Sequence, residues 1–165
     1  MDSKNRCMYL NAEHEFTMKE CDIPVPAEDE VLIKIAANGI CGSDIHFYAE
    51  GRLGNFVVTV PYIPGHEAAG SIAGFGSSVK CFNIGDKVAI EPGIPCGRCS
   101  YCLSGRYNLC PSVTFLSAPP VNGTFCDYVC VRSDFVYRIP DDMPMEYAAM
   151  IEPAAVAVHS VNRAG

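Results

Sequence analysis

Short apolar runs, bounded by glycine, proline and polar residues, form the main pattern along this chain. Each run is too short for an ordinary helix, and most are rich in β-branched residues, which is typical of strands. Strands separated by glycine and proline turns favour a small barrel or an irregular sandwich. The predicted strands span residues 31–35, 68–75, 87–90, 125–131 and 135–139.

A convincing helical pattern appears only near the end of the chain, over residues 145–162. Good helix formers there are mixed with apolar side chains at a spacing that indicates one buried face. Pro153 lies inside this stretch, so the sequence predicts that one helix ends there or that another begins. The residues expected on the buried face are Ala148, Ala149, Ile151, Ala155, Val156 and Val158.

Length, charge and cysteine content restrict the possible functions. The 165 residues fit one domain and leave little room for a nucleotide fold beside a catalytic one. The net charge of −7 argues against a nucleic-acid or anionic-membrane surface. The chain carries no secretory signal pattern and no apolar run of about 18 residues, so we expect a cytoplasmic protein. In such a compartment, ten cysteines favour metal binding or core packing over disulfides.

Four cysteines follow one another at the spacing C-x2-C-x2-C-x7-C. Four thiolates this close can surround one zinc ion tetrahedrally, which closes the site and makes it structural. An iron–sulfur cluster or two disulfides are the alternatives, although a ferredoxin run places its fourth cysteine differently. The surrounding residues 92–112 are dense in glycine, cysteine and proline, which predicts a separate lobe. The predicted ligands are Cys96, Cys99, Cys102 and Cys110.

A second set of potential metal ligands is scattered along the chain. Residues 39–46 are predicted to form a glycine-flanked loop that presents Cys41, and His66 with Glu67 opens a predicted strand. Glu152 adds a carboxylate in an apolar helical setting. A cysteine, a histidine and a carboxylate from distant segments describe a catalytic zinc with an open coordination position. Each residue also has an ordinary explanation as a core or surface side chain, so spacing alone leaves this site undecided.

The chain carries five strings in one order: GICGSDIHFY (39–48), PGHEAAG (64–70), GDKVAIEPGIPCGRCSYC (85–102), GTFCDYV (123–129) and IEPAAVAVHSV (151–161). Together they resemble the zinc-dependent medium-chain alcohol dehydrogenases, most closely the polyol branch that includes sorbitol and xylitol dehydrogenases. The resemblance implies that residues 1–165 form a GroES-like, mainly β catalytic domain. This domain would be an irregular barrel with a zinc-binding lobe, a few short helices, and one catalytic and one structural zinc.

The resemblance also assigns roles around the catalytic metal. Cys41 and His66 match zinc ligands of the family. Glu67 resembles a direct ligand of the polyol branch, whereas Glu152 matches a helix carboxylate that contacts the zinc-bound water or binds the metal. The sequence leaves the order of these two carboxylates open. Asp44 resembles the carboxylate that orients His66, as metal-bound imidazoles usually require.

Other matched positions imply how the reaction proceeds. Ser43 would receive the proton of the alcohol and His46 would pass it to solvent, while Glu152 is also expected to be catalytic. Phe47 and Phe115 resemble apolar walls of the substrate cleft. The implied reaction oxidises a secondary alcohol of a small-molecule polyol to a ketone with NAD or NADP, the zinc polarising the hydroxyl. A threonine dehydrogenase or a simple secondary-alcohol dehydrogenase is one alternative, and a non-catalytic zinc-stabilised binding module is another.

The family's nucleotide-binding fingerprint has no counterpart in the chain. The nearest string, at residues 74–79, lacks the third glycine of Gly-x-Gly-x-x-Gly and lies between strands. We therefore expect a chain truncated before its Rossmann domain, with no cofactor-binding residues and no turnover alone. The full-length protein is expected to bind NAD or NADP and to form a dimer or tetramer.

Overall fold

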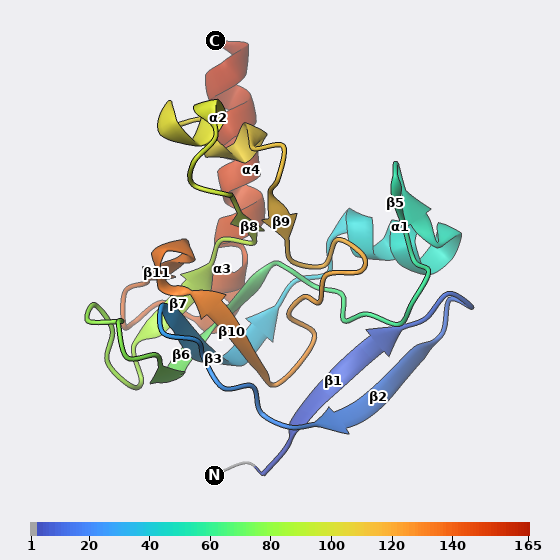
Figure 1. Ribbon diagram of the computed structural model, residues 1–165, viewed down its shortest axis with the longest axis horizontal. Coiled ribbons are helices and arrows are strands. Elements are labelled where there is room, and N and C mark those ends of the chain that lie inside the picture. The colour runs from blue at the N-terminus through green and yellow to red at the C-terminus, as the bar shows by residue number, and fades with distance from the viewer. Residues whose placement is uncertain (1–2) are drawn as a thin grey trace.

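A five-stranded antiparallel sheet forms the centre of the fold (Figure 1). The computed structural model describes residues 3–165. The strand order is β10-β3-β6-β7-β11, so strands distant in sequence pair with one another. The strands are β3 (Glu30–Asn38), β6 (Ala68–Phe75), β7 (Lys87–Ile90), β10 (Tyr128–Arg132) and β11 (Val136–Arg138).

The five predicted strands correspond to the five strands of this sheet. Two of them, 68–75 and 87–90, have the predicted bounds. β3 is longer than predicted, and β10 and β11 are shorter. Phe125 precedes β10, and its backbone N–H donates to the Pro64 carbonyl at 2.9 Å. The fold is mainly β, as predicted. Within the described residues β10 and β11 are the edge strands of this sheet and do not pair with each other, so the sheet does not close into a barrel.

The largest apolar cluster packs against this sheet. Val31 and Ile33 of β3 are fully buried, whereas Lys34, which lies between Ile33 and Ile35, is exposed. This alternation is the period-two pattern of a strand with one face toward the core. Burying each large aliphatic side chain contributes about 1.5–3 kcal/mol. The cluster also contains Ala68, Ile72, Val79, Phe82, Val88, Ile90, Leu116, Val131, Phe135 and Val136.

Three two-stranded sheets surround the main one, and none was predicted. Isolated bridges join Cys7 to Cys126 and Leu10 to Tyr62, which fasten the first of these sheets to the body of the domain. Its second strand is mostly exposed, so the apolar residues Phe16 and Met18 in that strand mark no face packed against a core. The strands are β1 (Asn5–Leu10) with β2 (Phe16–Cys21), β4 (Arg52–Leu53) with β5 (Phe56–Val57), and β8 (Gly93–Ile94) with β9 (Thr114–Phe115).

The loop predicted over residues 39–46 is wrong from Gly42 onward, because helix α1 spans Gly42–Glu50. Cys41 precedes the helix in extended conformation, and its N–H donates to the Asp44 carboxylate at 3.0 Å. This bond satisfies an N–H at the helix N-terminus. The helix ends at Glu50 and is capped by Gly51, which has a left-handed backbone and whose N–H donates to the Phe47 carbonyl.

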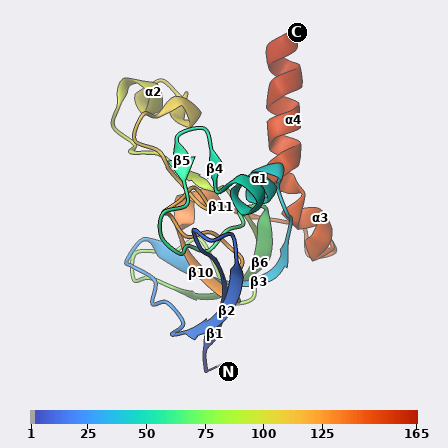
Figure 2. The ribbon, with the colours of Figure 1, turned by 90° about the vertical axis from the view of Figure 1, so that its right-hand side faces the viewer.

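The cysteine-rich segment projects from the domain as a separate lobe (Figure 2). It contains helix α2 (Ser100–Leu103) and the 3-10 turn η1 (Tyr107–Leu109), neither of which has a buried residue. A second 3-10 turn, η2 (Ser133–Phe135), joins β10 to β11. The lobe therefore has little hydrophobic core of its own. We expect its folded structure to depend on the four cysteines.

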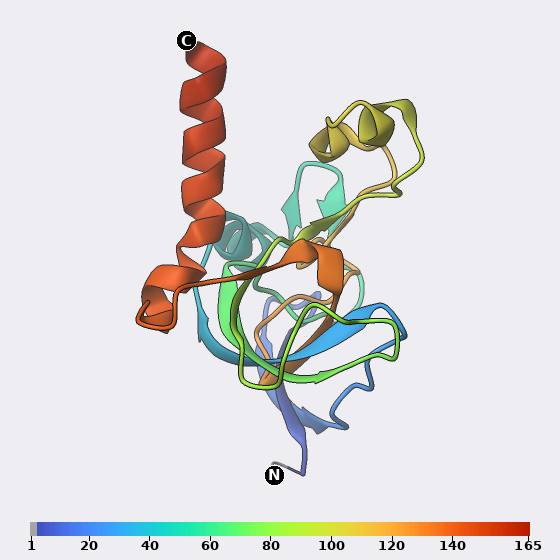
Figure 3. The same ribbon diagram turned by 90° about the vertical axis from the view of Figure 1, so that its left-hand side faces the viewer.

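The predicted helical stretch contains two helices, α3 (Met145–Ala149) and α4 (Ile151–Ala164). The break expected at Pro153 lies instead at Met150. Pro153 is the third residue of α4, where the missing N–H has no partner inside the helix anyway. The predicted buried face is confirmed only in α3, where Ala148 and Ala149 are buried, because α4 has no buried residue. Figure 3 shows α4 extending away from the sheet, which explains this difference. No helix of residues 3–165 has the length and apolar character needed to cross a membrane.

Candidate functional site

The four cysteines of the lobe come together as predicted from their spacing. Their sulfur atoms all lie within 4.8 Å of one another. The Cys99 and Cys102 sulfurs are 3.4 Å apart, and the Cys96 and Cys102 sulfurs are 3.9 Å apart. No disulfide joins any described cysteine. This set of four clustered thiols fits a closed tetrahedral zinc site.

The backbone of the lobe stabilises thiolate at one of these positions. Hydrogen bonds from the backbone of Arg98 and Cys99 lower the pKa of Cys96 to about 6. In contrast, burial and a hydrogen bond with Cys99 raise the pKa of Cys102 to about 11. Zinc requires its cysteine ligands as thiolates, so binding would release protons from the thiols that remain protonated.

The second group unites three of the scattered residues: Cys41, His66 and Glu67. Their potential ligand atoms lie within 4.8 Å of one another. Cys41 stands at the start of α1, and the other two immediately precede β6. His66 is 5% exposed, and its Nδ1 has no hydrogen-bond partner among the described residues. A buried nitrogen without a partner, beside a thiol and a carboxylate, fits a metal-binding group.

Gly39 makes room for the carboxylate of this group. Its N–H donates to the Glu67 carbonyl at 2.7 Å, and a Cβ at Gly39 would lie 2.1 Å from Glu67 Oε2. Only a residue without a side chain allows the present position of that carboxylate. No signal in the sequence indicates this role of Gly39, because contact between the two segments arises only from the pairing of β3 with β6.

We expect Gly39→Ala to lower zinc affinity at the Cys41 group by about 10–100-fold, the usual cost of disturbing a ligand's immediate support. The new methyl group would displace the flexible end of Glu67, so the chain should still fold. Competition titration with a chelator measures the affinity. Gly42→Ala is the matched control, because a Cβ there meets nothing within 4 Å. Equal affinities for Gly39→Ala and the wild type would contradict this role.

Glu152 lies beside the group but outside the set of clustered ligand atoms. It is half-buried in the first turn of α4. Burial raises the pKa of Glu152, while His66 lowers it and the Glu67 carboxylate raises it. The two carboxylates that the sequence left unranked are therefore distinguished by position, with Glu67 nearer to Cys41 and His66.

Asp44 makes different contacts from those implied by the resemblance. Its carboxylate accepts hydrogen bonds from the Cys41 N–H at 3.0 Å, the Gly65 N–H at 3.1 Å and the Ser117 hydroxyl at 3.0 Å. The Asp44 carboxylate accepts no hydrogen bond from the His66 ring nitrogen Nδ1, which has no partner among residues 3–165. Asp44 therefore holds the backbone next to both ligands and not the imidazole itself. Ser117 was not among the predicted residues, since a serine in a Pro-rich turn carries no distinctive signal.

The two residues of the expected proton path lie on α1. Ser43 and His46 are three positions apart in the helix, which places them on one face. Ser43 is half-buried, whereas His46 is exposed and lies 3.3 Å from the Glu50 carboxylate. The two side chains thus lie in sequence from the partly buried Ser43 to the solvent-exposed His46. Their relative position is fixed by the helix, which a loop would not ensure.

The two phenylalanines expected in the substrate cleft have different environments. Phe115 lies edge-on to His66, with ring centres 5.4 Å apart, and lines a cavity of about 750 Å³ that Glu152 also borders. Phe47 is only 3% exposed and packs in a core cluster with Leu10, Val58 and Tyr62. The placement of Phe47 in a cleft wall is therefore corrected: Phe47 anchors α1 to the core.

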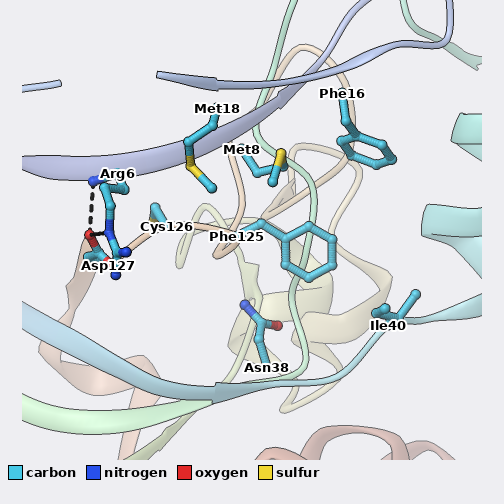
Figure 4. A pocket seen from close by; sticks show the side chains of 9 residues that line it. All are labelled: Arg6, Met8, Phe16, Met18, Asn38, Ile40, Phe125, Cys126 and Asp127. Carbon is cyan, nitrogen blue, oxygen red and sulfur yellow. Dashed lines mark hydrogen bonds and ion pairs between the residues drawn. The ribbon is translucent and has the colours of Figure 1, made fainter. Parts of the chain in front are cut away.

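A second cavity, of about 600 Å³, lies between the β1–β2 hairpin and residues 125–127 (Figure 4). Arg6 and Asp127 close one end with two hydrogen bonds of 2.9 Å. The remaining walls are mainly apolar and include Met8, Phe16 and Phe125. None of its lining residues borders the cavity beside Glu152, and none belongs to the group of Cys41, His66 and Glu67.

The known proteins that this chain is similar to are dehydrogenases and reductases. The family described as alcohol dehydrogenase GroES-like domain matches residues 27–141. Sorbitol dehydrogenase of Bacillus subtilis (strain 168) is 57% identical over 154 residues, which cover 93% of this chain and 44% of that protein. A probable D-xylulose reductase A of Neosartorya fischeri is 40% identical over 163 residues, covering 98% of this chain and 46% of the relative.

Solved structures agree with this assignment. L-idonate 5-dehydrogenase from Escherichia coli superposes with a TM-score of 0.90 at 34% identity, covering 100% of this chain and 48% of that one. The chain thus spans less than half the length of these relatives. The expected mainly β, GroES-like fold and the resemblance to polyol dehydrogenases are confirmed. The chain belongs to the alcohol dehydrogenase GroES-like domain family.

Proposed function

We propose that residues 1–165 form the catalytic domain of a zinc-dependent oxidoreductase that oxidises a secondary alcohol of a polyol to a ketone with NAD or NADP. The observation that carries the proposal is the group of Cys41, His66 and Glu67, with Glu152 beside it. The relatives named sorbitol dehydrogenase and D-xylulose reductase support the substrate class and the redox chemistry.

The proposed catalytic zinc would be held by Cys41, His66 and Glu67. When bound, the ion supplies Lewis-acid polarisation of a substrate hydroxyl. Ser43 Oγ would accept the hydroxyl proton and release its own proton toward His46, from which solvent is accessible. Glu152 would offer a second carboxylate at the reacting oxygen. Phe115 would shield this side of the cavity from water.

We further propose a structural zinc in the lobe 92–112, held by Cys96, Cys99, Cys102 and Cys110, which gives two zinc ions per chain. The nicotinamide would bind on another domain, because residues 1–165 contain no complete dinucleotide fingerprint. The unpaired state of all ten cysteines supports a cytoplasmic location. A dimer or tetramer of the full-length protein, acting on small molecules and on neither nucleic acid nor membrane, completes the proposal.

A chimera tests the proposed activity directly. Residues 1–165 would replace the matching part of Bacillus subtilis sorbitol dehydrogenase, which is 57% identical to them. We expect the chimera to oxidise polyols with NAD, whereas the 165-residue chain alone should bind two zinc ions and show no turnover. Zinc content and NADH formation are the measurements, and Cys41→Ser in the chimera is the inactive control.

Other outcomes would select another function. Preferred turnover of threonine or of a simple secondary alcohol by the chimera would replace the polyol assignment with one of those dehydrogenases. A folded chimera without activity, together with one zinc ion per chain that is unaffected by Cys41→Ser or His66→Ala, would indicate a zinc-stabilised binding module. Polyol oxidation by the 165-residue chain alone would contradict the need for a second domain.

A further inference from the structure

A buried polar cluster lies behind the proposed catalytic metal group. Asp44 is 3% exposed, Ser117 is 2% exposed and Tyr62 is fully buried. Buried polar side chains are costly unless they are hydrogen-bonded, so their contacts indicate what they do. Asp44 is accounted for by its bonds to the backbone beside the ligands, and Tyr62 packs in the core cluster with Phe47. Ser117 is left without an assigned role.

Ser117 has a hydroxyl with two matched partners. Its Oγ donates to Asp44 Oδ1 at 3.0 Å and accepts from the Gly65 N–H, also at 3.0 Å. The same Gly65 N–H is 3.1 Å from Asp44 Oδ1, so the three groups form a closed triangle. The second oxygen of Asp44 binds the Cys41 N–H. The triangle therefore joins the backbone that precedes His66 to the backbone of Cys41.

The backbone of Ser117 shows that this position is constrained. Its φ of 71° lies in the left-handed region, which is unfavourable for a residue with a side chain. Glycine would adopt this conformation without strain. Ser117 also follows the segment that holds Phe115 against His66. The hydroxyl is the feature of serine that glycine lacks, and it contacts both ligand-bearing segments.

We propose that Ser117 is a positioning residue of the catalytic metal centre. Its hydroxyl fixes Asp44 and the Gly65 N–H relative to each other, and through them it sets the separation of Cys41 and His66. A metal centre depends on the orientation of its ligands, so this contact affects how long the metal stays bound. The inference rests on the proposed function, because it assumes that a metal binds at this group.

Paired variants of Ser117 separate the hydroxyl from the backbone. Ser117→Ala removes the hydroxyl and keeps the strain, whereas Ser117→Gly removes the hydroxyl and relieves the strain. We expect both variants to release metal from the Cys41 group to a chelator about tenfold faster than the wild type, at the lower end of the effect of such supporting contacts. The chain would be loaded with zinc, and with Co²⁺ for a spectroscopic view of ligand geometry.

Two controls accompany the measurement. Release from the four-cysteine lobe should be unchanged, because none of its cysteines contacts the triangle. Ser78→Ala removes the hydroxyl of an exposed serine that belongs to neither group of potential ligands, so it should leave the release rate at the wild-type value. Ser117→Gly should unfold at a temperature no lower than Ser117→Ala, which separates metal release from global stability.

Three results would overturn the inference. Wild-type release rates and Co²⁺ spectra in both Ser117 variants would show that the hydroxyl does not position the ligands. Faster release in Ser117→Ala that Ser117→Gly restores would assign the effect to the backbone alone. A wild-type chain that binds metal only at the four-cysteine lobe would overturn the proposed function, and this inference with it.

Discussion

Replacing His66 with alanine should lower zinc affinity at the Cys41 group by more than about 100-fold, because loss of an outer supporting contact alone costs about 10–100-fold. The variant removes one of the three clustered ligands and the buried nitrogen that has no partner among residues 3–165. Zinc stoichiometry should fall from two ions per chain to one. In the chimera with the Bacillus subtilis enzyme, polyol oxidation should be lost with the metal.

His159→Ala is the matched control for this experiment. His159 is exposed on α4 and is not part of either group of potential ligands. Both zinc ions should remain bound in that variant. Two zinc ions in His66→Ala, with chelator competition curves that superimpose on the wild type, would remove His66 from the proposed site.

Replacing Cys99 with serine should disorder the cysteine-rich lobe while the central sheet stays folded. Neither α2 nor η1 has a buried residue, so little hydrophobic burial would compensate for the loss of a metal. Structural zinc contributes an apparent binding free energy of about 10–16 kcal/mol in zinc-finger peptides, which far exceeds what these short helices can supply. We expect the lobe's amide protection to fall to that of an unfolded segment.

Hydrogen exchange followed by mass spectrometry measures this effect locally. The Leu103 N–H, which donates to the Cys99 carbonyl at 3.0 Å, should exchange rapidly in the variant. The Ile72 N–H, which donates to the Asp86 carbonyl at 2.9 Å, should keep its protection. Cys81→Ser, at an exposed thiol outside the lobe, is the control. Retained protection in the Cys99→Ser lobe would show that its order does not depend on the four cysteines.

Local signals in the sequence were sufficient for several features. The strands β6 and β7 were predicted with their bounds, because glycine and proline limit their apolar runs. The four cysteines were predicted to cluster, because their spacing keeps them within a few turns of one chain segment. Glu67 and His66 were identified as adjacent candidates because they are consecutive residues.

Features that depend on distant contacts were predicted poorly. Helix α1 was expected to be a loop, because the glycines at its two ends are typical of loops. The packing of Phe47 against Leu10 and Tyr62, which are distant in sequence, stabilises the helix. The buried face predicted across α4 was wrong, because amphipathic spacing reports that a helix can be covered and does not identify the surface that covers it.

Sequence patterns alone were enough to establish the family, the sheet-forming segments and the types of side chain available for two metal groups. The carboxylate that joins Cys41 and His66 is set by the fold, because its position depends on the approach of Gly39 to Glu67 across β3 and β6. The fold also placed Ser117 against Asp44, 73 positions apart in the chain. Both contacts join segments that are distant in the chain, and a hydrogen bond or close approach between such segments produces no periodic pattern in the sequence.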